Sequence, residues 1–263
     1  MSEEHRLYLK KQRIHKIVVL IIQIGILLLS FGLWELSATL EWVDPFITSS
    51  PSRIVKSIVD LYKSGEIWLH LGATLYETVL SFTLATLIGV LVAVMLWWSK
   101  TLSEVIEPYL IVLNSLPKVA LGPLIIIWVG AGRSAIITMA LLISVIITII
   151  SAFTGFTSVE KEKIDLLRSM GANKLQILFK LILPQNIPNI ISILKINVGL
   201  SWVGTIMGEY LVSKEGIGYL LVYGSQVFKL DLVMASTVLL CILATLMYLI
   251  VALCEKLTKK YYK

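Results

Sequence analysis

Polar side chains that could hydrogen-bond a passing solute or a neighbouring helix recur inside an apolar stretch of this sequence. Four of them follow one another at four-residue steps: Asn197, Ser201, Thr205 and Glu209. On a helix this spacing gives a stripe that drifts slowly around the axis. Because polar groups are costly in lipid, we expect the stripe to face protein or water. It could pack helices together or line a transport path.

The same stretch contains Gly204 and Gly208, a GxxxG pair. Such a pair lets two helices approach closely. We take the two glycines as candidates for packing against a second copy of the chain. Because the 263 residues show no internal repeat, a two-copy assembly is the simplest expectation.

A second apolar stretch is interrupted near its middle by backbone-breaking residues: Pro108, Pro117, Gly122 and Pro123. Interrupted backbone at membrane depth is tolerated where it packs on protein or lines a cavity. The polar residues at this break are therefore candidates for lining a pore: Asn114, Ser115 and Lys118. The alternative is that Asn114 bonds a neighbouring helix and Lys118 extends toward the membrane surface.

The sequence lacks the residues that several kinds of chemistry require. It contains no Gly-Lys dipeptide and hence no P-loop, so ATP would have to be hydrolysed by another subunit. Its three histidines are scattered away from any Cys or carboxylate cluster, so we expect no metal and no cofactor. Serines within apolar stretches lack a His partner, which argues against an intramembrane hydrolase. We expect a protein that is not an enzyme.

A polar insert over residues 157–184 separates two apolar stretches and reads as two short helices. Thr157 and Glu160 have capping-box spacing, and so do Asn173 and Gln176. Gly171 can adopt the left-handed conformation that ends a helix, and we expect Pro184 to end the second helix. The insert is thus a compact helical hairpin that a partner outside the membrane could contact.

The spacing within this insert resembles the EAA loop of bacterial ATP-binding-cassette (ABC) importer permeases. The matching positions are Asp165, Leu166, Leu167, Gly171, Leu181, Leu183 and Pro184. Asp stands where the family usually has Glu, and two leucines replace the usual alanines. Further segments extend the resemblance from about residue 74 to the C-terminus and look like the nitrate/sulfonate/taurine branch: NSLPKVALGPL (Asn114–Leu124), WVGTIMGEYL (Trp202–Leu211) and GIGYL (Gly216–Leu220).

This resemblance implies a permease subunit that moves a small solute into the cytoplasm, such as nitrate, a sulfonate or taurine. It implies cytoplasmic ATPase subunits that contact Asp165, Leu166, Leu167, Gly171, Leu183 and Pro184, an extracytoplasmic solute-binding protein and a second permease copy. The branch also includes permeases for vitamin precursors such as the thiamine pyrimidine, which remains an alternative. An ion-coupled secondary carrier is the alternative from another class, and a membrane-bound DNA-binding protein is a distant third.

The composition requires a membrane protein, since 57% of the residues are hydrophobic and 15% are charged, against about 25% charged in soluble domains. A span needs about 20 predominantly apolar residues. Six candidates emerge in one domain, 1–263, of all-α class: 17–37, 74–98, 105–129, 135–156, 187–211 and 232–254. Ser50 and Pro51 open an amphipathic helix between the first two.

The distribution of Lys and Arg predicts the orientation in a bacterial inner membrane. Fifteen of these residues fall in the segments on the side of the N-terminus, and six fall in the loops on the opposite side. Both termini and the 157–184 insert should therefore lie in the cytoplasm. The first apolar stretch is long for a signal peptide, so we expect it to be retained as a span. The positive charge serves this topology, and we expect no nucleic-acid partner.

Overall fold

In a computed structural model, which describes residues 3–261, this part of the chain is helical and contains no strand. The predicted all-α class is confirmed. The elements in chain order are α1 (Glu3–Thr39), α2 (Pro45–Thr48), α3 (Pro51–Ser64), α4 (Glu66–Trp98), α5 (Lys100–Ser115), η1 (Lys118–Leu121), α6 (Gly122–Val129), α7 (Arg133–Thr157), α8 (Lys161–Ser169), α9 (Lys174–Ile177), η2 (Leu178–Ile182), α10 (Leu183–Val212), α11 (Ile217–Gln226) and α12 (Leu230–Tyr261).

Within the described residues, five helices are long and apolar enough to cross a membrane. These are Lys10–Thr39, Glu66–Trp98, Arg133–Thr157, Lys174–Val212 and Leu230–Lys256. The stretch predicted as an interrupted span over 105–129 consists of two helical segments, α5 and η1–α6, with a bend of 88° at the break, and the pair makes a sixth span when the two segments are counted as one. Pro117 lies in the break between them, where its missing N–H and fixed φ do not continue a helix.

The centre of the fold is α7, which packs along α4 on one side and α10 on the other. Small residues make this close contact possible. A Cβ added at Gly89 of α4 would lie 2.5 Å from the side chain of Thr148 on α7. Large side chains such as Phe156, Ile136 and Met139 fill the remaining space and are almost fully buried. The three helices form the closely packed centre of the chain.

The start of α10 differs from the prediction. The sequence predicts that Pro184 ends the second helix of the insert. Pro184 instead lies in the first turn of α10, and the helical path from Lys174 to Val212 is continuous. The turn before it, η2, is a π-helix in which the Leu183 N–H donates to the carbonyl of Leu178. A π-turn is wider than an α-turn, so it relieves the clash of a proline ring with the preceding turn.

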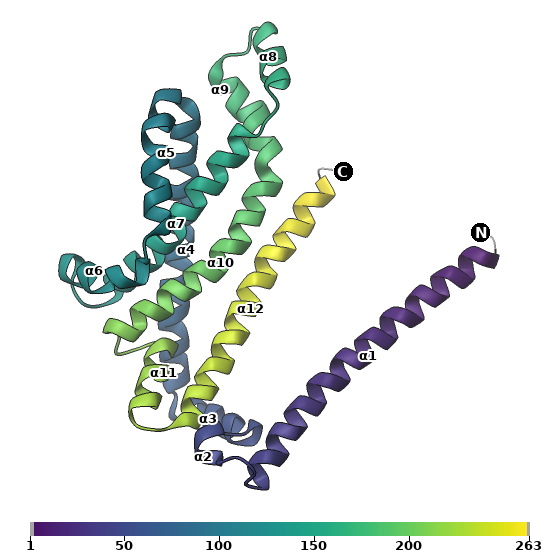
Figure 1. The fold of residues 1–263 in the computed structure, drawn as a ribbon, viewed down its shortest axis with the longest axis vertical. Coiled ribbons are helices and arrows are strands. Elements are labelled where there is room, and N and C mark those ends of the chain that lie inside the picture. Colours follow the sequence, from purple (N-terminus) through teal and green to yellow (C-terminus); the bar gives the residue numbers. More distant parts are fainter. Residues whose placement is uncertain (1–2, 262–263) are drawn as a thin grey trace.

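Figure 1 shows α8 and α9 at one end of the molecule, with both chain ends directed toward that end, and α2, α3 and α11 at the other. Helix α1 diverges from the bundle (Figure 1), and none of its apolar window is buried within the protomer. It is attached at its C-terminal end, where the Glu35 carboxylate accepts hydrogen bonds from the N–H and hydroxyl of Ser52 at 3.0 and 2.7 Å. Next to it, Arg53 pairs with Asp231 of α12 at 2.8 Å.

Candidate functional site

The polar insert folds into a helical hairpin formed by α8 and α9, with Gly171 at the turn. Gly171 has φ +82°, and a Cβ added there would meet nothing within 4 Å, so the backbone conformation is what requires glycine. Its N–H donates to the Arg168 carbonyl, and the Ala172 N–H donates to the Leu167 carbonyl, both at 2.9 Å. These bonds satisfy carbonyls at the end of α8, which confirms the predicted role of Gly171.

The two predicted capping boxes have different outcomes. At α9 the Asn173 side chain accepts from the Gln176 N–H while the Gln176 side chain accepts from the Asn173 N–H, both at 2.8 Å. The box predicted at Thr157 and Glu160 is wrong. Thr157 is the last residue of α7 and bonds the Phe153 carbonyl, so α8 begins at Lys161 without a side-chain cap.

Apolar residues of the whole insert, which runs from α8 through η2 to the start of α10, divide into a buried and an exposed set. Ile164, Leu167, Leu181 and Leu183 pack against a core cluster that includes Phe156 and Ile182. Four other side chains are 53–75% exposed: Leu166, Met170, Leu175 and Phe179. Pro184 is half-buried. The hairpin is therefore held firmly against α4 and α7 and still presents an apolar surface.

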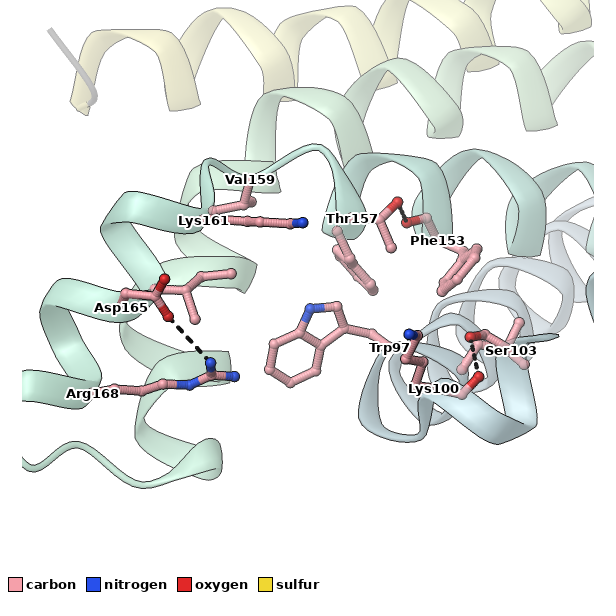
Figure 2. A pocket seen from close by; sticks show the side chains of 12 residues that line it. Trp97, Lys100, Ser103, Phe153, Thr157, Val159, Lys161, Asp165 and Arg168 are labelled. Carbon is pink, nitrogen blue, oxygen red and sulfur yellow. Dashed lines mark hydrogen bonds and ion pairs between the residues drawn. The ribbon is translucent and has the colours of Figure 1, made fainter.

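Asp165 lies at the side of the hairpin that faces the end of α4. Its carboxylate pairs with Arg168 at 3.2 Å, and both side chains are about two-thirds exposed, so the pair contributes little to stability. Figure 2 shows Asp165 and Arg168 on one side of a pocket, with Trp97 and Lys100 opposite. The structure thus places Asp165 at a pocket rim that also carries basic groups.

The polar stripe of α10 is buried inside the protomer. Asn197, Ser201, Thr205 and Glu209 are at most 1% exposed. The Asn197 amide donates to Thr148 of α7 at 2.7 Å and to Thr86 of α4 at 3.2 Å. Ser201 lies 3.3 Å from Ser144 of α7. In this conformation the stripe joins α10 to α4 and α7, as expected if its polar residues pack helices together. That these residues line a transport path stays a prediction.

Gly204 and Gly208 also face α7 of their own chain. A Cβ at Gly204 would lie 2.4 Å from the Ala140 Cα, and one at Gly208 would lie 2.8 Å from the Ile136 Cα. The prediction that these glycines pack against a second copy is therefore corrected. The close contact that they permit is already occupied by α7, so a second copy would have to use another surface.

The break between α5 and α6 is open, unlike the stripe of α10. Asn114 and Ser115 are exposed, and Lys118 is half-buried. The Lys118 ammonium donates to the Asn114 carbonyl at 3.4 Å and to its amide oxygen at 3.3 Å, which ties the two sides of the break together. These three residues can contact a solute beside the protomer, and their role in a pore stays a prediction.

Glu209 belongs to a buried polar cluster at the end of the molecule opposite to α8. Its carboxylate accepts from the Thr74 hydroxyl at 2.6 Å and from the Gly218 N–H at 2.5 Å. The Ile217 N–H donates to Thr74 at 2.8 Å, and the Gly216 N–H donates to His70 Nδ1 at 3.0 Å. Side chains of α4 and α10 therefore satisfy the first N–H groups of α11, which a helix leaves unpaired.

Sequence reasoning missed the other members of this cluster. Glu77 lies beside Glu209 and is 1% exposed, and Arg133 of α7 lies 3.8 Å from Glu77 and 2.7 Å from Glu215. A signal was present, since His70, Thr74 and Glu77 recur at steps of four and three residues and therefore share one face of α4. Gly216, with φ +101°, is the N-cap of α11, and Gly218 lies in its first turn; this helix was not predicted from the sequence.

Comparison with known proteins gives concordant matches. The family described as binding-protein-dependent transport system inner membrane component matches residues 85–260, which is more than half of the chain. The taurine transport system permease protein TauC of Escherichia coli (strain K12) is 27% identical over 87% of this chain and 85% of its own length. The formylaminopyrimidine transport permease protein ThiX of Halalkalibacterium halodurans is 28% identical over 71% of this chain and 74% of its own.

A solved structure with a similar fold belongs to a bacterial ABC transporter involved in the import of the acidic polysaccharide alginate. It covers 96% of both chains at 15% identity with a TM-score of 0.66. At this identity the likeness concerns the fold.

Proposed function

Because the chain belongs to the family of binding-protein-dependent transport system inner membrane components, we propose that it forms the solute path of an ABC importer. As a member of that family it is a multi-pass permease of the bacterial inner membrane. The membership argues against an ion-coupled secondary carrier and against a DNA-binding protein. The proposed complex contains two cytoplasmic ATPase subunits, an external solute-binding protein and a second permease copy.

The α8–α9 hairpin is the proposed contact with the ATPase. Four exposed apolar side chains between the start of α8 and η2 would remain in water unless a partner covered them: Leu166, Met170, Leu175 and Phe179. Burial of such surface is the main driving force of protein association. The chain has no P-loop of its own, so the ATPase must be separate. This exposed apolar surface on the predicted coupling loop is the observation that carries the proposal.

The proposed orientation places the hairpin and both termini in the cytoplasm. It is supported by the excess of Lys and Arg on that side and by the common direction of the chain ends and the hairpin in Figure 1. Helix α11 and the Glu209 cluster then lie at the external end, on the side of the solute-binding protein.

A second copy of the chain is proposed because large apolar surfaces are left without a partner. Helix α1 has no buried residue in its apolar window, and Ile127 and Trp128 of α6 are each 76% exposed. Lipid can cover part of this surface, but a solute path needs polar lining on more than one side. Native mass spectrometry of the purified complex should find two copies, and one copy would contradict the proposal.

The proposed substrate is a small solute with an anionic group, such as nitrate, a sulfonate or taurine. The taurine relative supports this class, since its match covers the larger share of the chain. The formylaminopyrimidine relative supports the second candidate, a vitamin precursor. Calorimetric titration of the solute-binding protein that co-purifies with this permease, with taurine and with formylaminopyrimidine, distinguishes the two. Binding of the pyrimidine alone would reject the anion.

The coupling role is tested by Gly171→Val. Valine at φ +82° is strained by about 1–3 kcal/mol and should displace α9 relative to α8. Gly65→Val is a matched control, since Gly65 has φ +78°, has nothing within 4 Å and lies at the opposite end of the molecule. We expect Gly171→Val and Asp165→Lys to lose uptake and ATPase co-purification while inserting normally. Gly65→Val should retain ATPase co-purification. Normal uptake by both hairpin variants would reject the proposal.

A further inference from the structure

A pocket of about 470 Å³ lies where the end of α4 meets the side of α8. A second hollow of about 410 Å³ adjoins it, and the two share Trp97, Lys100, Ile164 and Arg168. Figure 2 shows the Trp97 ring projecting between the two sides, with Asp165 and Arg168 on α8 and Lys100 at the start of α5. Together the two hollows are large enough for a phosphate-bearing group with its attached carbons.

Basic side chains dominate the charge of this pocket. Lys100, Lys161 and Arg168 line it, and Asp165 is the one acidic residue in its lining. Lys174 lines the adjoining hollow, donates to the Trp98 carbonyl and lies 5.9 and 5.2 Å from the ring centroids of Trp97 and Trp98. The pairs that these cations make, such as Lys100 with Glu104 at 3.6 Å, are exposed. Exposed pairs are weak, so an anion with several oxygens can compete for the cations.

The floor of the pocket is apolar, which distinguishes it from a site for a soluble anion. Its lining includes Leu96, Phe153 and Phe156, which belong to the last turns of two candidate spans, Glu66–Trp98 and Arg133–Thr157. The pocket therefore lies at the depth where hydrocarbon gives way to water. The neighbouring Trp97 and Trp98 are of the residue type enriched at that boundary. A ligand that matches both the basic side chains and the apolar floor has an anionic head group and an apolar tail.

We propose that this pocket binds the head group of an anionic phospholipid. The phosphate lies among Lys100, Lys161 and Arg168, and the first carbons of the acyl chains lie over Trp97 and Phe153. Basic pockets between spans near a membrane surface recognise lipid head groups in this way. The lipid joins the α4–α5 turn to α8, so it fixes the hairpin against the bundle. The leaflet is the cytoplasmic one if the proposed orientation holds.

Native mass spectrometry of the delipidated full-length chain tests this site, with phosphatidylglycerol and phosphatidylcholine added in turn. The chain should retain phosphatidylglycerol and not phosphatidylcholine. Neutralising three lining cations together, as Lys100→Gln, Lys161→Gln and Arg168→Gln, should weaken phosphatidylglycerol binding by about 100-fold. Lys161→Gln alone should weaken it by about fivefold, which keeps the test usable if the triple variant does not fold. Lys163→Gln is the matched control, because Lys163 lies on α8 outside the pocket lining and pairs with Glu160 at 3.2 Å.

Three outcomes would overturn the lipid site. Equal retention of both lipids would mean that the pocket does not distinguish an anionic head group from a zwitterionic one. Displacement of phosphatidylglycerol by millimolar inorganic phosphate would mean that the pocket binds a free ion. Loss of ATPase co-purification in the triple variant with unchanged lipid binding would mean that these cations contact the ATPase.

Discussion

Replacement of Gly204 by alanine adds one methyl group at the closest contact between α7 and α10. The added Cβ would lie 2.4 Å from the Ala140 Cα, 2.9 Å from its Cβ and 3.1 Å from its backbone nitrogen. Two of these atoms belong to the backbone, so no side-chain rotation can relieve the clash. The two helices must move apart or tilt.

The size of the effect follows from these distances. Carbon atoms in contact prefer a separation of about 3.5–4.0 Å, so the helices must separate locally by roughly 1 Å. Overpacking of this kind costs about 1–3 kcal/mol, which lowers the ratio of folded to unfolded protein about 5- to 150-fold. The separation also lengthens the nearby contact between Ser201 and Ser144, now 3.3 Å.

The assay is unfolding of the purified full-length chain by heat or by SDS titration, followed by tryptophan fluorescence. Gly199→Ala is the matched control, because it makes the same change in α10 where a Cβ meets nothing within 4 Å. We expect Gly204→Ala to be less stable than Gly199→Ala by the amount above, with the same oligomeric state. Equal stability of the two variants, combined with loss of a two-copy complex by Gly204→Ala, would refute packing within the protomer.

Two further changes test the Glu209 cluster and the open break between α5 and α6. Glu209→Ala leaves the Gly218 N–H and the Thr74 hydroxyl without their acceptor, so it should lower the free energy of unfolding by about 2–4 kcal/mol. Amide hydrogen exchange over residues 216–220 should become faster. Unchanged exchange would contradict the anchoring role of Glu209. Asn114→Trp removes one exposed hydrogen bond from Lys118, so it should cost about 1 kcal/mol or less while reducing reconstituted uptake; unchanged uptake would remove Asn114 from the solute path.

The parts of the site that the sequence predicted are those set by neighbouring residues. Gly171 ends α8 and the Asn173–Gln176 box starts α9 because each signal acts within four residues of itself. The break near Pro117 is local in the same way. Such features depend on backbone geometry and nearby hydrogen bonds, which the order of residues specifies directly.

The features that the sequence did not predict depend on contacts distant along the chain. A GxxxG pair indicates that some helix will approach, and Ala140 of α7 is the partner only because the chain folds back on itself. Pro184 was expected to end a helix by its local rule, but the preceding π-turn accommodates it. Helix α11 is similar, since its first N–H groups are paired by His70, Thr74 and Glu209 from other helices.

The two ends of the molecule are connected by one element. The helical path from Lys174 to Val212 begins in the hairpin proposed to contact the ATPase and ends beyond Glu209, which holds the first turn of α11. Between them the path is fixed to α7 by the contact at Gly204 and by the hydrogen bond from Asn197 to Thr148. Close-packed contacts of this kind resist small continuous adjustment, so a displacement of the hairpin has to be absorbed at α8, at the π-turn or by α4, α7 and α10 moving together. The π-turn and Pro188, which has no N–H to donate, are two points at which the hydrogen bonding of that path departs from the α-helical pattern.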